Sequence, residues 1–237
     1  MERENENEIR IEKLKVKGSL ITDKRIIIAQ DQGIKMELFI IQNNPNTILS
    51  EQGDYGSILW EGFAETNSEN IIEIKRAGPF CPFLYEASGH LLCSELAKSA
   101  FEKAGLSGIK FSEVKISKVV RWDWEAWAAP IDIAEIAPQI NEPEDLIELE
   151  NNDPELLATM PKIWSIESTH TIKIRRTAPY KYETRHKTIE AYDVLGAQGD
   201  ILTSNEYGGY IVTGIAKSVI EKICKEQISF IPLSVAN

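Results

Sequence analysis

One sequence pattern occurs twice in this chain of 237 residues, once near the middle and once close to the C-terminus. Residues 89–116 and 208–235 align without a gap, and 8 of the 28 aligned positions are identical. Each copy is typical of a short strand, a capped helix and a second strand. Internal duplication would explain the repetition, and the alternative is that such units resemble one another through shared physics alone.

The helix of each copy has its own start and stop signals. Ser94 and Thr213 occupy the same aligned position, and both residue types cap helix N-termini. Gly105 follows the first helix, where a left-handed residue commonly ends helices, whereas the second copy has Cys224 there. Apolar residues at helical spacing predict two buried stripes. These are Leu96, Ala100, Phe101 and Ala104 in the first copy, and Ile215, Val219, Ile220 and Ile223 in the second.

Most of the chain outside the two copies is strand-like. Short apolar or alternating runs predict strands at 36–42, 57–63 and 70–76, and again on both sides of a turn near 178–180. The predicted fold class is therefore α+β: strand-rich, with two related strand-helix-strand units and an acidic insertion between them.

The domain organisation follows from the same pattern. Residues 1–8 are polar and charged and are predicted to form a disordered tail. Residues 9–237 are predicted to form one globular domain. The alternative is two lobes, 9–128 and 162–237, joined by the acidic segment 129–161.

The negative charge of the chain is concentrated in one segment. The formal net charge is −11, and no lysine or arginine occurs between Arg121 and Lys162. Eleven of the 37 acidic residues lie there, and the remaining 26 equal the 26 lysines and arginines of the chain. Such a block repels nucleic acid and anionic lipid, and it attracts a cationic surface. A partner with a basic surface is expected, and neither a nucleic acid nor a membrane is.

The segment also supplies the candidate contact residues. Three tryptophans lie within six positions, where they either belong to the core or anchor a partner. The acidic residues form either a solvated loop or a docking surface. As a docking surface, the candidates are Trp122, Trp124, Trp127, Glu142, Glu144, Asp145, Glu148, Glu150, Asp153 and Glu155.

Motifs of known catalytic chemistry are missing from the sequence. No nucleophile elbow, zinc-protease helix, phosphate loop or dinucleotide-binding fingerprint occurs. Three widely spaced cysteines, Cys81, Cys93 and Cys224, are expected to be buried free thiols, and neither a metal site nor a cofactor is expected. His170 and His186 allow an acid–base site to be imagined, although both lie on predicted strand faces among charged residues.

The location of the protein is predicted from two features. No apolar run approaches the roughly 18 to 20 residues of a membrane-spanning helix, and the first ten residues, "MERENENEIR", are not those of a secretory signal. A cytoplasmic protein is expected.

The repeated unit resembles a known family. The runs "LLCSELAKSAFEKAGLSGIKFSEVKISK" and "YIVTGIAKSVIEKICKEQISFIPL" are similar to immunity proteins of bacterial polymorphic toxin and contact-dependent competition systems. One group of these carries a recurring line, "iVSe.l...l...gltG..F.Pv", preceded by an Asp-Ile pair. Asp200-Ile201 and Pro232-Leu233 match that pattern, whereas Thr213-Gly214 and Cys224-Lys225 depart from it.

The resemblance implies a non-enzymatic protein that binds and neutralises a cognate toxin, with no catalytic residues. The acidic segment agrees with that implication, because a cationic toxin domain would be steered toward it. Two rivals stay open: an enzyme of unrecognised type that uses His170 and His186, and an adaptor or assembly protein that uses the same acidic face.

Overall fold

The computed structural model describes residues 36–44, 58–121, 144–179, 181, 186–192, 194, 198–224 and 226–236. The chain divides into two compact units, Met1–Glu37 and Leu38–Asn237, and nearly all described residues belong to the second. The predicted tail at 1–8 lies outside the described residues. So do four candidate contact residues: Trp122, Trp124, Trp127 and Glu142.

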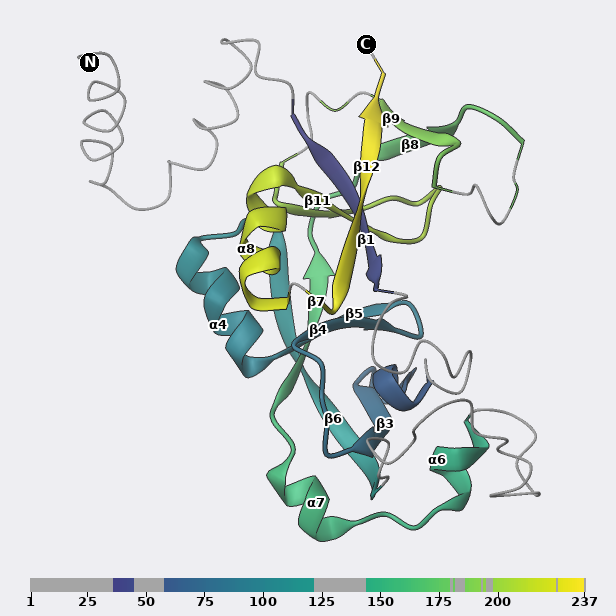
Figure 1. The fold of residues 1–237 in the computed structure, drawn as a ribbon, viewed down its shortest axis with the longest axis vertical. Helices are drawn as coiled ribbons and strands as arrows, with labels where there is room; N and C mark the ends of the chain where they lie inside the picture. The colour runs from purple at the N-terminus through teal and green to yellow at the C-terminus, as the bar shows by residue number, and fades with distance from the viewer. Residues whose placement is uncertain are drawn as a thin grey trace. The chain divides into compact units, whose positions relative to one another are not determined.

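The second unit is α+β, as predicted, and is built mainly of strands (Figure 1). Its strands are β1 (Leu38–Asn43), β2 (Phe63–Thr66), β3 (Ile72–Gly78), β4 (Leu84–Ala87), β5 (His90–Ser94), β6 (Ile109–Arg121), β7 (Ile163–Ser168), β8 (Lys173–Arg176), β9 (Ile189–Tyr192), β10 (Ile201–Thr203), β11 (Tyr210–Thr213) and β12 (Ile228–Val235). Its helices are α4 (Glu95–Ala104), α6 (Asp145–Leu149), α7 (Pro154–Thr159) and α8 (Gly214–Cys224). Every helix among the described residues is too short or too polar to cross a bilayer.

The described strands form two six-stranded sheets whose topologies match. One has the order β10-β11-β1-β12-β9-β8 and is called the β1 sheet. The other, the β7 sheet, has the order β4-β5-β7-β6-β3-β2. Position by position, β4, β5, β6, β3 and β2 correspond to β10, β11, β12, β9 and β8. The relation predicted for 89–116 and 208–235 therefore extends over nearly the whole unit.

The strand registers match as well. Phe111 of β6 pairs with Ile166 of β7, and Phe230 of β12, which is 119 positions after Phe111, pairs with Ile41 of β1. The parallel pairs β3·β6 and β9·β12 also start at corresponding residues. Common order, direction and register over so many strands favour internal duplication, because shared physics does not fix all three.

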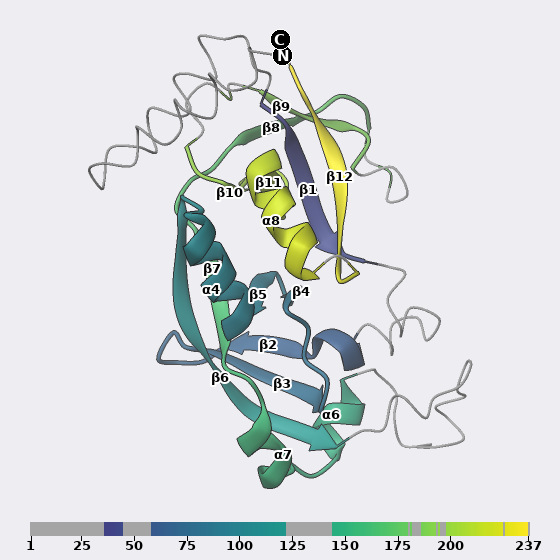
Figure 2. The ribbon, with the colours of Figure 1, turned by 60° about the vertical axis from the view of Figure 1, so that its left-hand side comes forward.

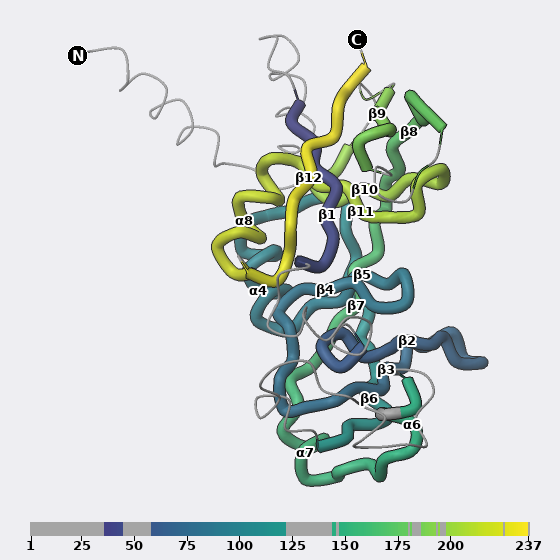
Figure 3. Tube along the Cα trace, turned by 45° about the vertical axis from the view of Figure 1, so that its right-hand side comes forward, coloured from purple at the N-terminus to yellow at the C-terminus, as the bar shows by residue number. Residues whose placement is uncertain are grey.

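Each half of the chain places its first strand in the sheet of the other half. β1 comes before β2 in the sequence, but it lies between β11 and β12, as Figure 3 shows. β7 comes before β8, but it lies between β5 and β6. Residues on both sides of the acidic segment therefore build both sheets.

The two copies share one core. Ala97 and Phe101 of α4 pack in one apolar cluster with their counterparts Ala216 and Ile220 of α8. Ile41 and Ile166 from the exchanged strands join the same cluster. The two helices lie side by side in both Figure 1 and Figure 2.

The predicted helix caps are confirmed. Ser94 Oγ accepts a hydrogen bond from the Ala97 amide, and Thr213 Oγ1 accepts the equivalent bond from Ala216. Gly105 ends α4 with φ of 67°, a left-handed conformation that costs glycine little.

The predicted stripes are wrong at Leu96 and Ala104 in the first copy and at Ile215 in the second, because all three side chains are exposed. Leu96 is 68% exposed and Ile215 is 55% exposed. Both precede an alanine that faces the core, and one helical residue turns a side chain by about 100°. The buried residues of the helices are Ala97 and Phe101 in α4, and Ala216, Ile220 and Cys224 in α8.

The predicted strand at 57–63 is also wrong. Residues 58–61 are helical, and β2 begins only at Phe63. Leu59 and Trp60 are both buried in one cluster, which two neighbouring residues of a strand cannot do on the same face.

Two polar contacts tie each copy to the other beside the shared core. The Asp200 carboxylate, in front of β10, accepts hydrogen bonds from the amide and hydroxyl of Ser107, which follows α4. It also accepts one from the capping residue Thr213. In the corresponding place, Gln227 after α8 accepts a hydrogen bond from the Phe83 amide in front of β4. The loop after each helix is thus fastened to the opposite copy.

A buried arginine lies beside a second apolar cluster, whose described members come from the β7 sheet, α6 and the helical residues 58–61. Arg76 of β3 is fully buried, and no carboxylate among the described residues pairs with it. Its guanidinium donates to the carbonyl oxygens of Trp60, Ala77 and Phe80, and to the Tyr85 hydroxyl. Burial raises the pKa of that hydroxyl, so it stays neutral. Hydrogen bonds to backbone carbonyls therefore offset most of the cost of removing the guanidinium charge from water.

Substituting Arg76 with methionine is expected to destabilise the protein by about 3 kcal/mol, because the apolar stem is kept while several buried carbonyls lose their donor. Urea denaturation measures the change. Arg175→Met is the matched control: that arginine is exposed and pairs with Glu190, so its loss costs less than about 1 kcal/mol. Equal stabilities of the two variants would contradict the role assigned to Arg76.

Candidate functional site

The described part of the acidic segment lies along the end of β6. It consists of α6, a short link at 150–153, and α7. The Asp153 amide donates to the Val119 carbonyl, and the Val119 amide donates to Asn152 Oδ1. The link therefore covers the edge of β6 that faces away from β3.

Each short helix of the segment buries an apolar residue and leaves its acidic residues outside. Ile147 of α6 is buried in the cluster that contains Trp60. Leu156 of α7 is buried, and the Asp153 carboxylate accepts a hydrogen bond from its amide, which makes Asp153 the helix cap. Pro154 stands at the first helical position, as the sequence predicts.

Three candidate acids have no ion-pair partner among the described residues. Glu144, Glu150 and Glu155 are all exposed. Beside them, Leu149 is 58% exposed, a large apolar side chain between two glutamates. These four residues form what we call the acidic face. The sequence did not identify Leu149, because apolar residues at helical spacing do not show which of them remains exposed to solvent.

The other acids in the described part of the segment are engaged. Glu148 pairs with Lys75 at 2.5 Å, and its carbonyl accepts a hydrogen bond from Lys118. The hydrogen bond that the Lys75 ammonium donates to the Glu148 carboxylate is the main cause that raises the pKa of Lys75. Asp145 also has an interaction partner. The charge of the acidic face is therefore smaller than the sequence count suggests.

Asp153 is held in its ionised form. Its carboxylate accepts the Leu156 amide hydrogen bond and lies 2.7 Å from Arg121 Nε. The amide hydrogen bond first, and the guanidinium second, lower the pKa of Asp153. Arg121 immediately precedes the acid-rich stretch in the sequence, so its pairing with the helix cap could have been suspected.

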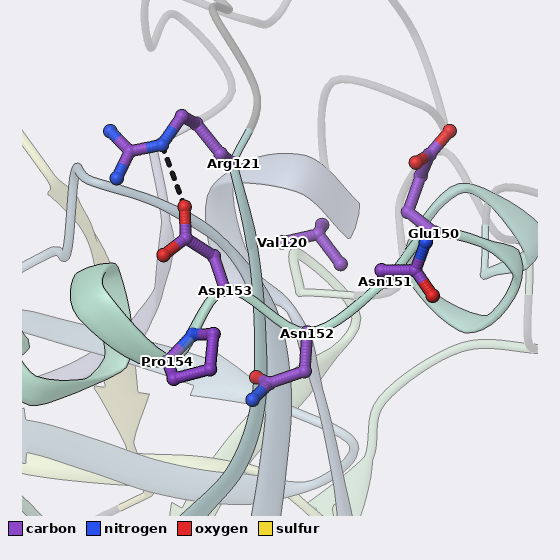
Figure 4. Close-up of a pocket in the computed structure, with 7 residues that line it drawn as sticks. All are labelled: Val120, Arg121, Glu150, Asn151, Asn152, Asp153 and Pro154. Carbon is purple, nitrogen blue, oxygen red and sulfur yellow. Dashed lines mark hydrogen bonds and ion pairs between the residues drawn. The ribbon is translucent and has the colours of Figure 1, made fainter.

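A pocket of about 350 Å³ lies between this ion pair and the link. Figure 4 shows Arg121 and Asp153 on one side and Glu150 and Asn151 on the other, with Val120 between them. Its size suits one side chain of a partner, and its carboxylate and amide oxygens are acceptors for an ammonium or guanidinium group. Among the described residues, no group of three or more His, Cys, Asp or Glu side chains is arranged to hold a metal ion.

The two histidines lie in separate surroundings. His170 Nδ1 is 2.9 Å from Thr169 Oγ1, and His186 Nδ1 is 2.6 Å from the Tyr207 hydroxyl. No contact joins the two imidazoles. The structure therefore does not bring them into one acid–base pair.

The three cysteines are free thiols. Cys93 and Cys224 are buried, and burial raises the pKa of both, to about 12 for Cys224. Cys81 is half-buried, and burial raises its pKa although Arg76 opposes the shift. Thiols that stay protonated are poor nucleophiles.

Comparison with models of known protein families gives no match for this chain, and comparison with curated proteins gives none. The site must therefore be interpreted from its own residues.

The lowered pKa of Asp153 can be tested by following its side-chain carbon by NMR as pH falls. We expect a titration midpoint below that of an ordinary aspartate. The ionised carboxylate contributes to folding stability at pH values above the pKa that Asp153 has in the unfolded chain. This contribution is lost as the pH falls through the lower pKa of the folded protein. Arg121→Gln is expected to restore the midpoint only in part, because the Leu156 amide still donates. A normal midpoint in the wild-type protein would show that the helix cap is not formed in solution.

Proposed function

We propose that the chain is an immunity protein that binds a cognate bacterial toxin domain and blocks its active site without any catalysis of its own. The observation that carries the proposal is the acidic face: three exposed glutamates without an ion-pair partner among the described residues, on the same segment as an exposed leucine and a pocket lined with acceptors. The resemblance of both copies of the repeated unit to immunity proteins supports the same function.

The charges of the acidic face suit a partner with a basic surface. No lysine or arginine among the described residues pairs with Glu144, Glu150 or Glu155, so the field of these carboxylates extends into solvent. Toxin domains that act on nucleic acid or nucleotides carry basic grooves to hold phosphates. An acidic face placed over such a groove competes with the substrate for the same cations.

Leu149 supplies an apolar anchor within this charged surface. A desolvated apolar contact slows release of a partner, whereas the surrounding charges speed its capture. The pocket beside Glu150 can receive one lysine or arginine side chain of the toxin, which would fix the register of the complex.

The proposal includes the place of action. An immunity protein that stays in the producing cell must meet its toxin where the toxin acts, so we propose a cytoplasmic partner whose target is a nucleic acid, a nucleotide cofactor or a translation factor. The tryptophans at 122, 124 and 127 belong to the proposed contact by their sequence position alone.

The proposal predicts that reversing the acidic face abolishes protection. Cells that co-express the chain with the toxin domain encoded beside it should survive. The variant Glu144→Lys/Glu150→Lys/Glu155→Lys should lose protection, with toxin binding at least tenfold weaker, because three favourable charges become repulsive. Survival assays and surface plasmon resonance measure the two effects.

Two controls sharpen this experiment. Glu37→Lys/Glu69→Lys/Glu226→Lys changes the net charge equally at exposed glutamates outside the acidic face, and it should still protect. His170→Ala/His186→Ala should also protect, whereas an enzyme that uses these residues would lose activity. Death of cells that carry the wild-type chain, with no complex formed, would overturn the proposal. A pull-down that recovers several unrelated partners would favour an adaptor instead.

A further inference from the structure

The outer surface formed by α4 and α8 carries an exposed aliphatic side chain at equivalent positions of the two copies. Leu96 and Ile215 are 119 positions apart, and both lie in the first turn of their helix. Exposing a large apolar side chain to water is unfavourable. One such residue would need no explanation, but the same exposure in both copies of a duplicated unit indicates that something covers it.

The residues around these two positions also agree between the copies. Among the helical positions that are exposed in both copies, three are identical. The pairs are Ser99 and Ser218, Glu102 and Glu221, and Lys103 and Lys222. Of the buried pairs, Ala97 and Ala216 are identical, whereas Phe101 corresponds to Ile220. Packing explains similarity at buried positions, but it does not explain identity on the outside.

In each copy, one lysine lies over two aromatic rings at equivalent positions. Lys98 lies over the rings of Phe111 and Trp164, and Lys217 lies over the equivalent rings of Phe230 and Phe39. Each of these lysines also pairs with the glutamate one turn later in its helix. These contacts immobilise long side chains on the surface beside Leu96 and Ile215. A rigid surface loses little entropy when another molecule packs on it.

The charge of this surface differs from that of the chain as a whole. The two helices together contain three glutamates and four lysines, whereas the chain carries −11. Lys103 and Lys222 have no ion-pair partner among the described residues, and neither has Glu95. In α4, Glu95 in the first turn and Lys103 in the last turn are complementary to an antiparallel copy of the same helix.

We propose that the surface of α4 and α8 is the interface of a homodimer, in which a second copy of this chain covers Leu96 and Ile215. An isologous dimer needs a surface that is complementary to itself, and a near-neutral surface with balanced charges meets that condition, whereas the acidic face would repel its own copy. Because α4 and α8 are corresponding helices of the two copies, both can take part in the interface through equivalent residues. The acidic face of α6 and α7 is on other elements and is left free.

Analytical ultracentrifugation and light scattering test the proposal over a concentration range of about 1 to 100 μM. The wild-type chain should be dimeric at the top of this range. Leu96→Glu and Ile215→Glu should each raise the dissociation constant at least tenfold, and by similar factors, because the two positions are equivalent. The double variant should be monomeric throughout.

Leu149→Glu is the matched control, because that leucine is similarly exposed but belongs to the acidic face. It should leave the dimer unchanged. Thermal unfolding by circular dichroism should give the same melting temperature for the monomeric double variant as for a dilute wild-type sample, since both side chains are on the surface. A wild-type chain that stays monomeric at the highest concentration overturns the proposal, and so does a dimer that survives both substitutions. Because the acidic face takes no part in this interface, failure here leaves the proposed toxin binding untouched.

Discussion

The exchange of β1 and β7 is the constraint on which the rest of the structure depends. Each is the third strand of a six-stranded sheet whose other members come from the opposite half of the chain. Without β1, the edges of β11 and β12 would be left unpaired, and without β7 the same would hold for β5 and β6. Ile41 and Ile166 then bring both sheets into the core shared by α4 and α8. Neither half can complete its hydrogen bonding or its core alone.

The duplicated architecture also explains where the two copies differ. The β1 sheet ends its long strand at Val235, whereas β6 continues to Arg121 and leads into the acidic segment. The additional elements of the first copy are the helical residues 58–61, α6 and α7. Buried Arg76 donates to carbonyls of Trp60 and Phe80, and Ile147 of α6 packs in the same apolar cluster as Trp60. The candidate site is therefore an elaboration of one copy, placed on a scaffold that both copies build.

The sequence was sufficient for features that depend on local chemistry. Caps at Ser94 and Thr213, the start of α7 at Asp153-Pro154 and the fold class all follow from residue types at short spacing. The strand exchange could not be predicted, because period-two patterns show that a segment is a strand but not which strand it pairs with. The exposure of Leu96, Ile215 and Leu149 could not be predicted for a related reason. Apolar residues at helical spacing show that a helix is amphipathic, but not which surface it packs against.

The acidic face and the surface of α4 and α8 differ in charge, and this difference suits them to different binding partners. A surface rich in unpaired carboxylates repels its own copies, so it cannot serve in self-association, but it favours a cationic partner. The near-neutral surface of α4 and α8 has the opposite properties. The chain can therefore associate with itself through the second surface while the acidic face stays exposed, and each dimer would present two acidic faces. Two such faces would raise the local density of negative charge and, with it, the rate at which a basic toxin is captured, without any new contact within either site.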